Sequence, residues 1–181
     1  MPEPGDGTVV RGNVYEEDGF TLTNLSFPTG AGGAFNSIHP PNFRYSNSVS
    51  FYNNVQNGVT QLTKTGGGNF DLVSIDLDGL NYAVSTHATF IGYKADFSSV
   101  FQTFYTDAVF PSRQTFIFPA SFAALTRVTW MNEAGNTGTF LPFHQFDNVV
   151  ANVPEPSSVV LGVVGLAVVL CRRRIRNDRS A

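Results

Sequence analysis

The chain has 181 residues, which suits one domain of ordinary size with a short appendage, and it carries a formal net charge of −3. Its 17 Phe, 6 Tyr and one Trp, with only 14% charged residues, provide ample apolar surface for a core and exclude a disordered chain. Residues 172–181 hold five Arg and one Asp, a net of +4, which leaves −7 for residues 1–171. An acidic body offers no basic stripe for phosphates, so nucleic acid is not expected as a partner.

The start of the chain and its cysteine content set two further limits. Residues 1–8 are turn formers and acids without an apolar stretch, so they do not form a secretory signal peptide. Export would therefore require a leader encoded upstream of Met1. Cys171 is the only cysteine, which excludes an intrachain disulfide and a thiolate-rich metal site.

From residue 9 onward, short apolar segments alternate with turn residues such as Asp18-Gly19 and Asn57-Gly58, which accept the positive φ of tight turns. No helical period is sustained between these segments. We therefore predict that residues 1–152 fold as one antiparallel β-sandwich, with a closed barrel as the alternative. The predicted strands cover residues 9–15, 20–25, 48–52, 59–65, 70–77, 87–93, 100–106, 114–118, 126–131 and 145–152.

One long connection interrupts this series. Residues 29–41 are rich in Gly, Ala, Asn and Pro, and this composition predicts a surface loop. Loops of this length in a compact domain often carry function, so the segment is either a binding edge or a plain connector.

The pattern changes abruptly at residue 153. Pro154, Glu155 and Pro156 cannot continue a strand ladder, so the domain is expected to end there in an extended linker. Residues 157–171 then carry no charge and are predicted to form a single apolar helix. A cluster of arginines follows this helix, at Arg172, Arg173, Arg174, Arg176 and Arg179.

The apolar helix and its arginines predict a membrane anchor. A helix of fifteen residues is about 22 Å long, whereas the hydrocarbon core of a bilayer is about 30 Å thick. Snorkelling arginines and local thinning of the bilayer reduce this mismatch, and the arginines are expected to stay on the cytoplasmic side. The alternative is a buried C-terminal helix or strand of the domain, but this segment is apolar on every face.

The order of these three parts in residues 153–181 resembles the PEP-CTERM sorting signal. The resemblance implies a protein of a Gram-negative bacterium that makes exopolysaccharide. It also implies that an exosortase, an integral-membrane cysteine peptidase or transpeptidase, recognises Pro154, Glu155 and Pro156 as substrate residues. The protein would be held briefly in the inner membrane and then delivered to the cell surface or extracellular matrix. A cytosolic protein with an incidental apolar tail is the competing interpretation.

The body in front of the tail carries looser resemblances. Residues 15–20, residues 70–77 and residues 146–149 are similar to the β-rich bodies that precede such tails, and they look like a jelly-roll sandwich related to carbohydrate-binding modules. In related sandwiches a structural Ca²⁺ often joins the first and last strands. The resemblance then implies Glu16, Glu17 and Asp147 as ligands, the alternative being an acidic turn and an exposed strand position.

Residues suited to catalysis form no pattern along the chain. His39, His87 and His144 are scattered, and no serine stands in a nucleophile-elbow context. We therefore expect a binding or structural module, with a secreted polysaccharide-acting hydrolase as the alternative. Polysaccharide is a candidate ligand because aromatic rings stack on sugars. The candidate rings belong to Tyr45, Tyr52, Tyr82, Tyr93, Tyr105 and Trp130.

Overall fold

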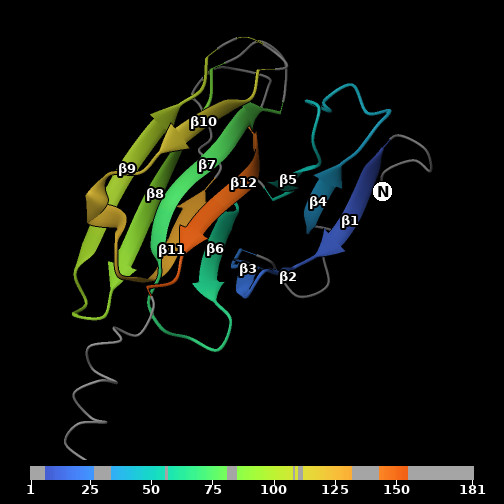
Figure 1. Ribbon diagram of the computed structural model, residues 1–181. Coiled ribbons are helices and arrows are strands. Elements are labelled where there is room, and N and C mark those ends of the chain that lie inside the picture. Colours follow the sequence, from blue (N-terminus) through green and yellow to red (C-terminus); the bar gives the residue numbers. More distant parts are fainter. Residues whose placement is uncertain are drawn as a thin grey trace, which may run out of the picture.

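A computed structural model describes residues 7–26, 34–55, 57–80, 85–107, 109, 112–131 and 143–154. Within these residues the chain forms two antiparallel sheets of six strands each, which face one another across a shared core (Figure 1). The mainly β fold and the sandwich predicted from the sequence are thereby confirmed. The predicted helix at residues 157–171 lies outside the described residues, among which no helix is long and apolar enough to cross a bilayer.

The two sheets interleave strands from the whole length of the body. Sheet A has the order β1 (Thr8–Gly12), β4 (Phe35–Ile38), β5 (Ser50–Asn53), β12 (His144–Asn152), β7 (Asp71–Gly79) and β10 (Gln114–Ile117). Sheet B has the order β2 (Val14–Glu17), β3 (Phe20–Asn24), β6 (Val59–Lys64), β11 (Leu125–Met131), β8 (His87–Lys94) and β9 (Ser99–Tyr105). A short 3₁₀ turn, Ala120–Phe122, precedes β11.

Aromatic rings from both sheets fill the space between them. Phe90 of sheet B lies 5.0 Å from Phe118 and 5.3 Å from Trp130, measured between ring centroids. Trp130 in turn meets Phe146 of sheet A edge-on at 5.3 Å. Large rings give the greatest apolar burial per residue. Because Trp130 is only 2% exposed, it belongs to this core and offers no platform for sugars.

The segment predicted as one strand over residues 9–15 is two strands in different sheets. β1 ends at Gly12, whose φ of 87° lies in the left-handed region, and β2 begins at Val14. A glycine adopts this conformation without the penalty that a Cβ atom imposes. The chain therefore turns at Gly12 and passes from sheet A to sheet B.

The predicted surface loop over residues 29–41 is wrong for its second half. Phe35–Ile38 form β4, and all four residues of this strand are buried. Asn36 and Ser37 concealed the strand in the sequence because they are polar, but Asn36 donates to the Tyr52 hydroxyl and Ser37 accepts from Arg11. Hydrogen-bonded polar groups can be buried at little cost. Residues 29–33 lie outside the described residues.

Candidate functional site

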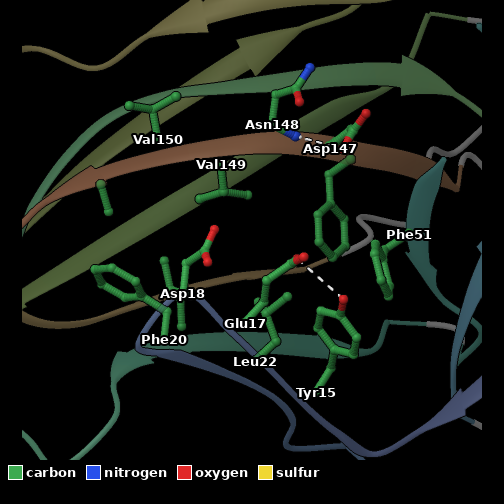
Figure 2. A pocket seen from close by; sticks show the side chains of 13 residues that line it. Tyr15, Glu17, Asp18, Phe20, Leu22, Phe51, Asp147, Asn148, Val149 and Val150 are labelled. Carbon is green, nitrogen blue, oxygen red and sulfur yellow. Dashed lines mark hydrogen bonds between the residues drawn. The ribbon is translucent and has the colours of Figure 1, made fainter. Parts of the chain in front are cut away.

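A pocket of about 560 Å³ lies between the two sheets, where β2 and β3 face β12 (Figure 2). Its volume falls within the range of sites that hold small organic ligands. Strands from both sheets supply its lining, so it is a gap within the sandwich wall. The lining residues are Tyr15, Glu17, Asp18, Phe20, Leu22, Phe51, Leu62, Phe146, Asp147, Asn148, Val149, Val150 and Ala151.

The walls of the pocket are apolar. Phe20 and Leu22 come from β3, and Val149 and Ala151 come from β12. The Tyr15 and Phe51 rings meet at 4.7 Å between centroids, tilted by 46°, and this contact joins sheet B to sheet A beside the pocket. Aromatic and aliphatic side chains therefore provide most of the surface that a ligand would touch.

Polar groups stand on one side of the pocket. The Tyr15 hydroxyl donates to Oε2 of Glu17 at 3.2 Å. Partial burial raises the pKa of Tyr15, and the negative charge of Glu17 raises it further. Figure 2 shows the carboxylates of Glu17 and Asp18 directed toward β12. No arginine, lysine or histidine is among the residues that line this pocket.

The β2–β3 turn fixes the position of these carboxylates. Asp18 and Gly19 both have positive φ, 50° and 79°, and they connect strands whose last paired residues are Glu17 and Phe20. Such a two-residue turn matches the twist of a hairpin, as the Asp-Gly pair in the sequence predicts. The hairpin therefore presents Glu17 and Asp18 at a defined place.

A bulge in β12 shapes the opposite wall. The register of β12 shifts between Asp147 and Val150, and Asn148 has a φ of 45°. Figure 2 shows Asp147 and Asn148 on the side of β12 away from Val149. Two consecutive side chains thus point outward, a usual effect of a bulge.

β12 also has an open backbone edge beside the pocket. β5 pairs with β12 only at Phe51 and Phe146, whereas β7 continues to pair with it as far as Asn152. Beyond Asp147, the β5 side of β12 therefore lacks a strand partner within the described part of the chain. This early end of the pairing leaves the gap that the pocket occupies.

The outer side of the bulge carries a partly buried polar network. Asp147 forms an ion pair with Arg113 at 2.9 Å and accepts from the Ser48 hydroxyl at 2.7 Å. Asn148 donates to Asp76 at 2.7 Å. These contacts connect β12 to β7, to the residue that precedes β10 and to the segment that leads into β5, so they fix the bulge in place.

Asp78 is the carboxyl group in this region whose chemistry is most altered. Burial raises its pKa, and hydrogen bonds from the Ser112 backbone and the Gln145 side chain act in the opposite direction. Asp78 is only 1% exposed. An acid without access to solvent cannot act on an external substrate, so Asp78 serves the fold.

A serine and a histidine also lie close together, without the properties of a nucleophile and its base. Ser37 Oγ is 2.9 Å from Nε2 of His39, and the Arg11 guanidinium donates to the same Ser37 oxygen at 2.8 Å. Ser37 has no exposed surface. A substrate could not reach this hydroxyl, and the arginine competes for the histidine nitrogen. The arrangement fastens β1 to β4.

The carboxylates considered for calcium have other partners, although Glu17 and Asp147 both line the pocket. Glu16 accepts from Thr21, Glu17 accepts from Tyr15, and Asp147 is held by Arg113. Neighbouring residues of a strand point to opposite faces, which separates Glu16 from Glu17. Among the described residues no group of three or more His, Cys, Asp or Glu could hold a metal ion, and calcium ligation by these three residues stays a prediction.

A second feature is an exposed aromatic strip on β9, at the edge of sheet B. Phe101 and Tyr105 are 80% and 67% exposed, and they lie on the same face of the strand. His87 of β8 stacks on the Tyr105 ring at 5.4 Å. Of the other rings considered for sugar binding, Tyr45, Tyr52 and Tyr93 are half-buried and Tyr82 lies outside the described residues.

The Pro-Glu-Pro segment predicted as a linker begins where the sandwich ends. β12 finishes at Asn152, and Val153, the next residue, is 43% exposed. Pro154 is also exposed. Glu155, Pro156 and the arginines Arg172, Arg173, Arg174 and Arg176 lie outside the described residues.

The pocket was not predicted from the sequence. Its residues are contributed by five strands, and only the Asp-Gly turn after Tyr15-Glu16-Glu17 gave a local indication of where polar groups would project.

Comparisons of the chain with protein-family models, with curated proteins and with solved structures gave no match.

Proposed function

We propose that this chain is an exported protein of the cell surface or exopolysaccharide matrix of a Gram-negative bacterium. Its body is a jelly-roll-like module that binds a ligand without transforming it, and residues 153–181 are its sorting tail. The observation that carries the proposal is the order of motif, uncharged segment and arginines in that tail. A charged cluster after an apolar segment orients it in a membrane, with the positive end in the cytoplasm.

The end of the sandwich supports this role of the motif. Because β12 is complete at Asn152 and the chain is exposed from Val153, a peptidase could reach the linker without opening the fold. A proline-rich segment is also stiff and extended, so it loses little conformational freedom when it enters a protease cleft. Cleavage in the linker would leave all the described strands intact.

The surfaces of the body support a binding role. The pocket offers apolar walls with carboxylates on one side, and the β9 strip exposes two rings. The carboxyl group with the raised pKa, Asp78, is closed to solvent. Concave apolar surface with a few polar groups is typical of ligand sites.

Processing of the tail can be tested with a pair of matched substitutions. The chain, preceded by a bacterial secretion leader, would be produced in a host that has an exosortase and in the same host without it. Glu155→Ala should abolish the exosortase-dependent shortening of the protein, as measured by mass spectrometry. Glu3→Ala is the control, because Pro2-Glu3-Pro4 repeats the motif without the helix and arginines. Unchanged processing of the Glu155→Ala chain would overturn the proposal.

A further inference from the structure

We propose that the pocket between β2, β3 and β12 binds an organic cation, namely a protonated amine carried on a body with an apolar face. The inference deepens the proposed function, on which its biological setting depends. It names the chemistry of the ligand that the binding module would take. The lining of the pocket supplies both halves of this recognition, a negative charge and apolar walls.

The charge of the lining selects for a cation. Glu17, Asp18 and Asp147 are its charged residues, and all three are acids. Arg113 balances Asp147 at 2.9 Å, which leaves the net negative charge at Glu17 and Asp18. Both of these residues are exposed, so a cation gains their attraction as it enters. An anion of the same size would be repelled by the same two groups.

The walls select for an apolar body next to the charge. Phe20, Phe51 and Phe146 line the pocket together with Tyr15, and the Phe51 and Phe146 rings are stacked at 6.2 Å between centroids. Ring faces attract a cation that lies within about 6 Å of the ring centroid. Aromatic surface beside a carboxylate is therefore well suited to an ammonium group with apolar substituents.

Tyr15 joins the two halves of the site. Its ring packs on Phe51 at 4.7 Å, and its hydroxyl donates to Glu17 at 3.2 Å. The hydrogen bond orients the Glu17 carboxylate at the boundary between the aromatic wall and the acidic side. A positively charged group placed there would contact both, while its apolar body would lie against Leu22 and Val149.

Such a ligand could come from two sources with the same chemistry. One is a free amine of low molecular weight, and the other is an amino-sugar unit of a matrix polysaccharide, whose pyranose ring has an apolar face that stacks on aromatic rings. Both present an ammonium group beside apolar carbon and hydrogen. The probes of the experiment distinguish them.

The experiment measures binding by the purified full-length chain with isothermal titration calorimetry. The probes are 2-phenylethylammonium, its neutral counterpart 2-phenylethanol, a glucosamine tetramer and the N-acetylglucosamine tetramer. We expect at least one of the two amines to bind at least tenfold more tightly than its neutral counterpart. Tight binding of the phenylethylammonium ion alone would identify a free amine, and tight binding of the glucosamine tetramer would identify the polysaccharide unit.

Matched substitutions place the binding in the pocket. Glu17→Gln combined with Asp18→Asn removes both charges, and Asn tolerates the positive φ of the turn. This double variant should lose about tenfold in affinity for the amine. Glu16→Gln is the control, because it removes a neighbouring carboxylate that points to the other face of β2, and its effect should be less than twofold. Thermal unfolding of each variant shows that the fold is retained.

Either of two results would overturn the inference: equal affinity for an amine and its neutral counterpart, or no difference between the double variant and the Glu16→Gln control. These results are separable from those for the tail. Amine binding is measured on purified protein and does not require an exosortase, whereas processing at Glu155 does not require an occupied pocket.

Discussion

At the level of single residues, His144 makes the stability of the fold depend on pH. It is 2% exposed, and burial lowers its pKa to about 4, with a smaller contribution from the nearby His87. Within the described part of the chain, its Nδ1 has no hydrogen-bond partner. Below the ordinary histidine pKa of about 6.5, the unfolded chain gains a proton at this position that the folded chain does not take up.

Because the unfolded chain binds the additional proton, acid should destabilise the folded protein. The free energy of unfolding should decrease as the pH falls from about 6.5 to about 4, by up to roughly 1.4 kcal/mol per pH unit from this group. Urea unfolding at pH 7 and pH 5 measures the decrease. In a His144→Gln chain the difference between the two pH values should become smaller, and an equal difference in both chains would contradict the assignment.

Phe90 is the residue whose truncation should damage the core most clearly. Its ring contacts Phe104, Phe118 and Trp130 at 5.0 to 5.8 Å, and it has no exposed surface. Phe90→Ala should lower the free energy of unfolding by about 3 to 5 kcal/mol. Chemical denaturation provides the measurement. Phe101→Ala is the control on the neighbouring strand, where the ring is 80% exposed, and it should change stability by about 0.5 kcal/mol or less.

At the level of the elements, the ion pair between Arg113 and Asp147 fixes the bulge of β12. The two side chains are 18% and 17% exposed, so solvent screens them only in part. Asp147→Asn should destabilise the protein by about 1 to 3 kcal/mol, because the pair and the charged acceptor of Ser48 are lost together. A double-mutant cycle with Arg113→Gln isolates the coupling, and a coupling free energy near zero would refute this role.

The strands and one turn were predictable because their signals are local. Residues 20–23 alternate in polarity, and β3 covers Phe20–Asn24. Asp18-Gly19 predicts a hairpin turn, and both residues have the positive φ that this turn needs. Alternation and turn chemistry act over a few neighbouring residues, so they can be recognised in the sequence alone.

The features that were not predicted from the sequence depend on residues that are distant in the chain. Asn36 and Ser37 gave no sign of a buried strand, because their hydrogen bonds come from Tyr52 and Arg11. The pocket likewise exists because β5 stops pairing with β12 after Phe51. The ion pair of Asp147 is likewise made with Arg113, which is distant in the sequence. Polarity along the chain does not encode such pairings.

For the whole molecule, the arrangement predicts that the sandwich does not need the tail. A chain that ends at Pro154 keeps every described strand, so its thermal unfolding midpoint should match that of the full chain within about 2 °C, a shift that corresponds to well under 1 kcal/mol. Circular dichroism measures this midpoint. The full chain should partition into lipid vesicles, and the shortened one should stay in the aqueous phase.

The opposite result would assign the tail to the fold. If the shortened chain unfolds at a much lower temperature, the apolar segment of residues 157–171 packs against the sandwich, and the membrane interpretation fails. Replacing Arg172, Arg173 and Arg174 with Gln in the full chain is a useful companion, because it leaves the apolar segment unchanged and removes the charges that orient it.

The position of β12 in sheet A means that this sheet can be completed only late in synthesis. This strand lies between β5 and β7, although both were synthesised many residues earlier (Figure 1). Until a ribosome has released residues 144–152, sheet A consists of two separate halves, and the pairing that unites them spans a long stretch of sequence. Sheet A is therefore completed only when the last strand of the body has been synthesised, whereas all six strands of sheet B precede that strand in the chain.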